Sequence, residues 1–400
     1  MDLSFSQDEI AFRDDLRALF RREIPSRIRE MVSAGHSLSK QDLIDSQRIL
    51  NKLGLAVPHW PVEWGGRDWT AIQRYIFIEE LQRAAVPLPL QFNCFMVGPV
   101  IARFGTTEQK TRFLQRAANL DDWWCQGFSE PDAGSDLASL KMKAERSGSG
   151  GYILNGQKTW TTYAQYADWI FCLVRTDSNV KKQAGISFIL VDMKSPGITV
   201  RPIITVDGRH EVNEVFFDNV EVPKDNLVGE ENRGWDYAKF LLANERSGIA
   251  RIGLSKERVA RVRRLAQRTR AGGGTVWDSE SFRTRVIHLE TDLKALEMTQ
   301  MQVLARQSLN PETTQPDPTS SILKIRGSQL QQAATELLME IAGADGLLDG
   351  GDPASALTDN NATTNTSSAM SLYLNFRKVS IYGGSNEIQR SIIAKTILGL

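Results

Sequence analysis

The chain has 400 residues, 41% of them hydrophobic, which is enough apolar material for ordinary buried cores in roughly two or three domains. Its 48 basic and 48 acidic side chains cancel, so the net charge gives no reason to expect a nucleic acid or an anionic membrane as a partner. No run of about 18 apolar residues occurs, and we therefore expect no membrane-spanning helix.

The N-terminal residues and the cysteines indicate a cytoplasmic protein. Met1–Ser6 have neither a basic region nor an apolar core, so we expect no signal peptide. The three cysteines form no CxxC pair and no disulfide framework, which favours a reducing compartment. The four histidines lack ligand spacing, so we expect no protein metal site.

Residues 1–122 are predicted to be mostly helical. Ser6 and Glu9 form a capping-box pattern, apolar residues then recur at helical spacing, and Pro25 ends the helix. Further helices are expected over 39–53, 70–84, 92–104 and 107–117, with a compact loop at 54–69. His59, in that loop, is interpreted as a packing residue because no acid or nucleophile lies near it in the sequence.

Residues 123–235 are predicted to form a small antiparallel β-domain of sandwich or barrel type. β-branched and aromatic residues alternate there, and turn signals recur every 8–12 residues. Asn155-Gly156 is a hairpin signal that predicts a tight turn.

Residues 236–400 are predicted to be helical again. The expected helices cover 236–269, 279–307, 318–342, 367–380 and 386–398. Residues 360–368 are poor in apolar side chains and are expected to form an exposed loop. The predicted fold class is therefore α+β, with an N-terminal helical domain (1–122), a central β-domain (123–235) and a C-terminal helical bundle (236–400).

One stretch, residues 123–162, combines aromatic and hydroxyl side chains beside a tight turn. Pro131 and Gly134 favour the turn, while Ser129, Ser135 and Asp136 supply short polar groups. This combination suits a flat heteroaromatic ligand with a phosphate tail. An antiparallel sheet with a buried tryptophan explains the same pattern without a ligand.

The chain resembles the acyl-CoA dehydrogenase family over essentially its whole length. The motifs that carry the resemblance are Ser129-Glu130-Pro131 with Ala133-Gly134-Ser135-Asp136, Asn155-Gly156-Gln157-Lys158 with Trp160 and Thr162, and Ile381-Tyr-Gly-Gly-Ser-Asn-Glu-Ile-Gln-Arg390. The start of the chain, Pro58-His-Trp-Pro61 and Asp122-Trp-Trp-Cys-Gln126 further resemble the large subunits of two-component members of the pimeloyl-CoA dehydrogenase type.

The resemblance implies non-covalent FAD and an acyl-CoA substrate that loses an α-proton and a β-hydride to give a trans-2-enoyl-CoA. By similarity, the cofactor contacts are Gln126, Phe128, Ser129, Trp160, Thr162, Ser385 and Glu387. The implied substrate contacts are Ser135, Arg246, Tyr382 and Gly383.

The position of the catalytic base departs from the commoner family pattern. Many members carry a carboxylate directly after the tyrosine of the C-terminal motif, where this chain has Gly383, which cannot accept a proton. The family also uses a position just before an arginine early in the C-terminal domain, which here is Glu245 before Arg246. Glu245 is therefore the expected base, the alternative being a surface Glu-Arg pair. The Gly383 N–H is a candidate donor to the thioester oxygen.

A second departure concerns the partner. The Arg-x-x-Phe-Gly stretch that reaches the cofactor across a subunit interface in homomeric relatives is missing around residues 270–290. We therefore expect a dimer or heterotetramer with a small acyl-CoA dehydrogenase subunit, and an electron-transferring flavoprotein as acceptor. The narrower resemblance implies a dicarboxylic, branched or polycyclic acyl group. The alternatives are a flavoprotein of the same fold that uses O2 on a non-CoA substrate, and a scaffolding subunit without activity.

Overall fold

The computed structural model describes residues 5–245, 250–309, 317–347 and 368–400. Contacts divide the chain into two compact units that interleave along the sequence. The helical unit comprises Met1–Ser46, Trp69–Leu88 and Arg246–Leu400, and the sheet unit comprises Gln47–Asp68 and Pro89–Glu245. The three consecutive domains expected from the sequence remain a prediction.

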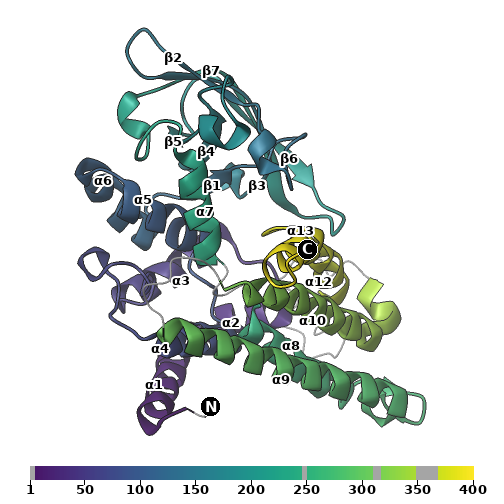
Figure 1. Cartoon of the computed structure of the whole chain (residues 1–400). Helices are drawn as coiled ribbons and strands as arrows, with labels where there is room; N and C mark the ends of the chain where they lie inside the picture. Colours follow the sequence, from purple (N-terminus) through teal and green to yellow (C-terminus); the bar gives the residue numbers. More distant parts are fainter. Residues whose placement is uncertain (1–4, 246–249, 310–316, 348–367) are drawn as a thin grey trace. The chain divides into compact units, whose positions relative to one another are not determined.

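The sheet unit is built on one seven-stranded sheet with the order β1-β4-β2-β3-β7-β6, in which β5 also pairs with β4 (Figure 1). Its strands are β1 Trp124–Gly127, β2 Lys143–Arg146, β3 Tyr152–Thr162, β4 Trp169–Arg175, β5 Ile186–Asp192, β6 Ile198–Ile204 and β7 His210–Val222. The sheet is mixed rather than purely antiparallel as predicted, because β1 runs parallel to β4 with Trp124 opposite Trp169. Both β4 and β5 are buried almost throughout, as the length of their apolar runs predicts.

The predicted hairpin turn at Asn155-Gly156 is wrong, since both residues lie inside β3. The turn that joins β2 to β3 is instead at Ser147–Gly151, where Ser147 N donates to Gly151 O at 3.0 Å. Gly156 is needed at a register shift, because an added Cβ would lie 2.9 Å from Met142 Cα. Glycine in this strand therefore marks a close backbone approach rather than a turn.

The helices of the sheet unit are α5 Gly98–Phe104, α6 Thr107–Asn119 and α7 Gly234–Glu245, preceded by a π-helix, η2 Phe92–Val97. The sequence predicts a single helix over 92–104, and the structure changes its first part to π geometry. A Cβ on Gly98 would lie 2.0 Å from the Trp60 ring, so this segment packs unusually closely on Trp60. Asn93 Nδ2 donates to Ala117 O and Asp122 O at 3.0 and 2.7 Å, which ties η2 to the end of α6.

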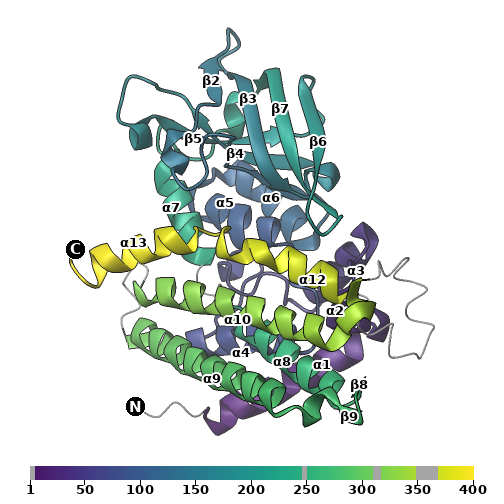
Figure 2. The same ribbon diagram turned by 90° about the vertical axis from the view of Figure 1, so that its right-hand side faces the viewer.

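The helical unit stacks its long helices in layers, and Figure 2 shows α9, α10 and α12 as successive layers. Its helices are α1 Gln7–Glu23, α2 Ser26–Ala34, α4 Ala71–Arg83, α8 Ile252–Ala266, α9 Glu280–Leu309, α10 Thr319–Ala342, α12 Ala369–Asn375 and α13 Asn386–Thr396. Another helix, α3 Lys40–Lys52, belongs to both units, because the division falls after Ser46.

The helices of this unit meet through an apolar core and buried ion pairs. The core side chains come mainly from α8, α9 and α10, among them Val262, Val286 and Leu330. Lys256 of α8 joins Glu79 of α4 and Glu297 of α9, each at 2.6 Å. These carboxylates compensate the charge that Lys256 brings into a largely buried place.

Two helix predictions need correction. The single helix predicted over 236–269 is wrong, because α7 ends at Glu245 and α8 begins at Ile252, after Arg251 in a left-handed conformation with φ 47°. Helix α2 was not predicted, and Pro25, expected only to end α1, also precedes the first residue of α2. The expected loop at 360–368 falls outside the described residues, except for Ser368.

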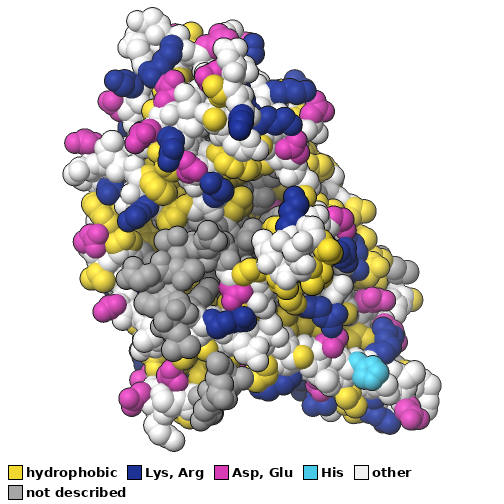
Figure 3. All heavy atoms as spheres, viewed as in Figure 1, with side chains coloured by type: hydrophobic (Ala, Val, Ile, Leu, Met, Phe, Trp, Pro, Cys, Tyr) yellow, Lys and Arg dark blue, Asp and Glu magenta, His cyan; other side chains and the backbone are white. Residues whose placement is uncertain are grey.

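On the face shown in Figure 3, basic and acidic side chains are interspersed, in keeping with the balanced composition. None of the described helices has the length and apolar character needed to cross a membrane. Cys94, Cys125 and Cys172 are free thiols, and all three are buried. Burial raises the pKa of the Cys172 thiol to about 12.

Candidate functional site

The most unusual side chain of the sheet unit is Trp160, on β3. It is 61% exposed, and its backbone is left-handed with φ 56°. The pairing of β3 with β7 is interrupted between Lys158 and Thr161, so Trp160 lies in a β-bulge. A bulge redirects a side chain out of the sheet, and here it turns a large aromatic ring toward solvent. The alternative explanation of this stretch, a sheet with a buried tryptophan, does not hold for Trp160.

The turn after β1 lies directly beside this bulge. Thr159 N donates to Ser129 O at 2.9 Å, which brings Ser129 next to the residue that precedes Trp160. Gln126, Ser129 and Thr162 are half-buried, so they retain some exposed surface. The structure therefore brings the Ser129 turn next to the Trp160 bulge, and Gln126 and Thr162 lie on the two strands involved, β1 and β3.

Phe128 differs from the other predicted cofactor contacts because its side chain is in the core. It is 5% exposed, and its ring packs edge-on against Phe171 and Phe188, with centroids 5.7 and 6.2 Å away. Phe128 can therefore offer a ligand its backbone rather than its ring. Its carbonyl oxygen accepts a hydrogen bond from Lys158 Nζ at 3.2 Å.

Lys158 and Glu130 form a buried ion pair to which the sequence motifs gave no role. Lys158 is 0% exposed, and its Nζ donates to Glu130 Oε1 at 2.7 Å and to Leu173 O at 2.8 Å. Burial lowers the pKa of Lys158, and the nearby charge of Glu130 opposes that shift. The sequence carries no local signal of this burial, because Lys158 is flanked by the polar residues Gln157 and Thr159.

Ser135, the predicted substrate contact, lies in the exposed loop that follows Glu130. The loop is closed at its start by paired backbone bonds between Glu130 and Ala133, both 3.0 Å long. Asp136 beside it pairs with Lys182 at 3.1 Å on the surface. Ser135 is therefore accessible and close in sequence to the turn that carries Ser129.

The C-terminal motif lies in the helical unit and contains the N-terminus of helix α13. Gly383 and Gly384 both adopt left-handed conformations, with φ 65° and 82°. Ser385 is the N-cap of α13, and its hydroxyl accepts from Ile388 N at 3.4 Å. Glu387, in the first turn, is exposed, and its pKa is lowered, most of all by a backbone hydrogen bond. Tyr382 is 43% exposed.

The expected base lies at the end of a described helix. Glu245 is the last residue of α7, and its side chain, like the whole of Arg246, lies outside the described part of the structure. Helix α7 packs against η2, α5 and the strands β4 and β5 within the sheet unit. The structure thus fixes the helix that carries Glu245 but leaves the role of its carboxylate a prediction.

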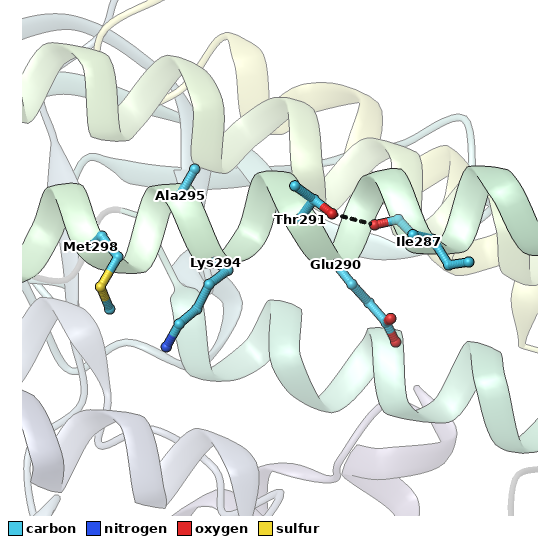
Figure 4. Close-up of a pocket in the computed structure, with 6 residues that line it drawn as sticks. All are labelled: Ile287, Glu290, Thr291, Lys294, Ala295 and Met298. Carbon is cyan, nitrogen blue, oxygen red and sulfur yellow. Dashed lines mark hydrogen bonds between the residues drawn. The ribbon is translucent and has the colours of Figure 1, made fainter. Parts of the chain in front are cut away.

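A separate hollow of about 420 Å³ lies on the surface of α9 (Figure 4). Its lining residues all belong to that helix and are Ile287, Glu290, Thr291, Lys294, Ala295 and Met298. Thr291 Oγ1 donates to Ile287 O at 2.9 Å and is thereby occupied within the helix. Because all of these lining residues come from one helix, the hollow does not enclose a ligand between elements.

The groups around the Trp160 bulge and the Ser129 turn fit a flat, mostly apolar ring system that carries polar groups on its rim. The Trp160 ring offers a stacking face, and the side chains of Ser129, Thr162 and Gln126 offer hydrogen bonds. No group of three or more His, Cys, Asp or Glu side chains suited to a metal ion occurs among the described residues.

Comparison with known proteins identifies the family to which the chain is similar. The models described as acyl-CoA dehydrogenase N-terminal, middle and C-terminal domain match residues 6–121, 125–220 and 232–398. Acyl-CoA dehydrogenase IpdE1 of Mycobacterium tuberculosis is 33% identical over 98% of both chains.

Solved structures agree. A chain of the ChsE4-ChsE5 complex from Mycobacterium tuberculosis superposes with a TM-score of 0.83 at 31% identity, over 100% of this chain and 99% of that one. The steroid acyl-CoA dehydrogenase Tcur3481-Tcur3483 gives a TM-score of 0.84 at 27% identity over the same shares.

Proposed function

Because the chain belongs to the acyl-CoA dehydrogenase family, we propose that it oxidises the Cα–Cβ bond of an acyl-CoA thioester to a trans-2-enoyl-CoA, with FAD as cofactor. The observation that carries the proposal is the exposed Trp160, held in a bulge beside the Ser129 turn. A stable monomeric core does not need a large indole in solvent, whereas a planar cofactor needs a stacking surface.

The cofactor contacts of the sheet unit are assigned to residues around the Trp160 bulge and the Ser129 turn. Trp160 packs against the ring system, while Ser129, Thr162 and Gln126 hydrogen-bond its polar edge. Phe128 contributes backbone only, since its side chain is in the core. Ser385 and Glu387 are also assigned to the cofactor, and Ser135, Tyr382 and Arg246 are assigned to the CoA thioester. FAD, when bound, accepts the hydride from the β-carbon.

Glu245 is assigned as the base that removes the α-proton. An α-proton beside a thioester is weakly acidic, so the site must stabilise the developing negative charge and keep its base from being solvated. Gly383 cannot be that base, but its backbone N–H is assigned as a donor to the thioester oxygen. Arg246 is assigned to hold charge and geometry next to Glu245.

The acyl group is assigned to the polycyclic class and the partner to a small acyl-CoA dehydrogenase subunit. Support comes from the similar proteins, one of which is a steroid acyl-CoA dehydrogenase and another of which was solved as the ChsE4-ChsE5 complex. An electron-transferring flavoprotein is assigned as the acceptor of the electrons, which gives the reduced flavin a route back to its oxidised form.

The test is anaerobic bleaching of the flavin absorbance by a panel of CoA thioesters. The panel contains straight-chain, dicarboxylic and polycyclic acyl groups, each tried with and without the small subunit. We expect bleaching by polycyclic thioesters and little by the others. Bleaching by none of them, in either preparation, would leave a scaffold without activity. Oxidation of a non-CoA substrate with O2 would identify the alternative flavoprotein.

Replacing Trp160 by Ala should separate binding from stability. Substitution of an exposed side chain away from the core changes the free energy of unfolding by no more than about 0.5 kcal/mol. Loss of one aromatic stacking partner should weaken FAD binding by about 0.5–1.5 kcal/mol, or roughly 2- to 13-fold. The measurements are the Kd for FAD from fluorescence quenching and the midpoint of thermal unfolding. Trp160→Phe is the matched control, and it should retain most of the affinity.

A further inference from the structure

Lys158 and Glu130 join distant parts of the sheet unit through a closed set of hydrogen bonds. The three N–H groups of Lys158 have three acceptors, which are Glu130 Oε1 at 2.7 Å, Leu173 O at 2.8 Å and Phe128 O at 3.2 Å. The ammonium is fully buried and fully satisfied, so its position is fixed from three directions.

Glu130 extends the same set of bonds to the far end of the loop. Its Oε2 accepts from Lys141 N at 2.6 Å, and its Oε1 accepts from Met142 N at 3.0 Å. The loop of residues 128–142 therefore has its first carbonyl held by Lys158 and its last amides held by Glu130. Arg175 holds the last part of the loop, because its Nη2 donates to Ala138 O and Leu140 O at 2.8 and 3.1 Å.

A purely structural role does not require two charges at this place. An apolar pair of similar volume usually stabilises a core as well as a buried ion pair does. Two apolar side chains, however, could bind neither the Phe128 carbonyl nor the Lys141 and Met142 amides. What the charges add is a fixed backbone position for the loop, on the side where Ser129 meets the Trp160 bulge.

We propose that Lys158 and Glu130 are positioning residues for the cofactor, which hold the Ser129 turn in register with the Trp160 bulge. The proposal rests on the proposed function, since it takes the Ser129 turn and the Trp160 bulge as the binding place of FAD. Neither side chain touches the ligand; both act through the backbone of residues 128–142. The pair sets how tightly and in what orientation the flavin ring is held.

The decisive variant is the double substitution Lys158→Met with Glu130→Leu in the full-length chain. It removes both charges together, so no unpaired charge is left in the core. We expect faster amide exchange across residues 129–142, a Kd for FAD raised about 10- to 100-fold and a shifted absorption band of the bound flavin. Lys143→Met is the matched control, because Lys143 is exposed on the neighbouring strand β2.

Unchanged FAD affinity and an unchanged flavin spectrum in the double variant would overturn the proposal. If that variant does not fold, the single variant Glu130→Gln decides, because it keeps the shape and one acceptor oxygen. It should weaken FAD binding by a smaller factor, and binding equal to that of Lys143→Met contradicts the positioning role.

The outcomes also separate this proposal from the proposed function. If the wild type binds FAD but no acyl-CoA bleaches it, the proposed function fails while the comparison of FAD affinities still stands. If the wild type takes up no FAD with or without the small subunit, both are overturned. Loss of affinity in the double variant alone, with acyl-CoA bleaching in the wild type, supports both.

Discussion

Replacing Glu245 by Gln should slow reduction of the flavin by an acyl-CoA about 10²- to 10⁴-fold, the usual contribution of a positioned general base. Gln has nearly the same shape, but its amide cannot accept the α-proton. Binding of FAD and of the thioester should change little, so the loss is expected in the rate of the reductive step rather than in affinity. Anaerobic stopped-flow measurement of flavin bleaching gives this rate directly.

Asp236→Asn is a suitable control for that experiment. Asp236 is an acid on the same helix, α7, where it pairs with Arg233 and Lys239 at 3.1 and 2.9 Å on the surface. Its loss removes one negative charge from α7 without removing the proposed base, and the reductive rate should stay at the wild-type value. A full rate in Glu245→Gln would exclude Glu245 as the base, and another carboxylate would then have to remove the α-proton.

The second large effect concerns partner-dependent binding of FAD. Saturation at about 100 times the Kd should stabilise the protein by about 2.7 kcal/mol when the small subunit is present. For the chain alone we expect a much smaller gain at the same FAD concentration. The thermal unfolding midpoint, measured with and without FAD for each preparation, tests this expectation.

The region that lacks the Arg-x-x-Phe-Gly motif explains why we expect the chain alone to bind FAD poorly. In this structure it folds into a short hairpin, β8 Arg270–Ala271 with β9 Gly274–Thr275, followed by the start of α9. Phe282 is buried in the core of the helical unit, and Arg283 Nη1 donates to Trp277 O at 3.3 Å. These side chains are committed to local packing. Stoichiometric FAD on the chain purified alone would contradict the need for a partner.

The helices were predictable where capping chemistry and apolar spacing agree. Thr70 with Gln73 and Thr106 with Gln109 form capping boxes at the starts of α4 and α6, close to the predicted boundaries. The break between α7 and α8 was not predictable, because the apolar spacing continues through it while Arg251 adopts a left-handed conformation. The close packing of Gly98, directly after η2, on Trp60 likewise joins residues that are far apart in sequence.

The site was predictable as a set of residues but not as an arrangement. The motifs identify Trp160 and Ser129, yet the exposure of Trp160 follows from a bulge that no local pattern near Lys158 indicates. Phe128 belongs to the same motif, but long-range packing against Phe171 and Phe188 places its ring in the core. The ion pair of Lys158 with Glu130 needed the fold, since it joins residues on different segments.

The interleaving of the two units has a consequence for how the chain folds during its synthesis. All segments of the sheet unit have left the ribosome once residue 245 has emerged, so this unit can form first. Helix α4 must wait for α8, which begins about 170 residues after Arg83, a delay of roughly 8–34 s at ordinary rates of elongation. During that time the face of α4 that later packs on α8 is uncovered. We expect chaperones to bind this face of α4 in nascent chains, and truncations before residue 252 to leave it uncovered.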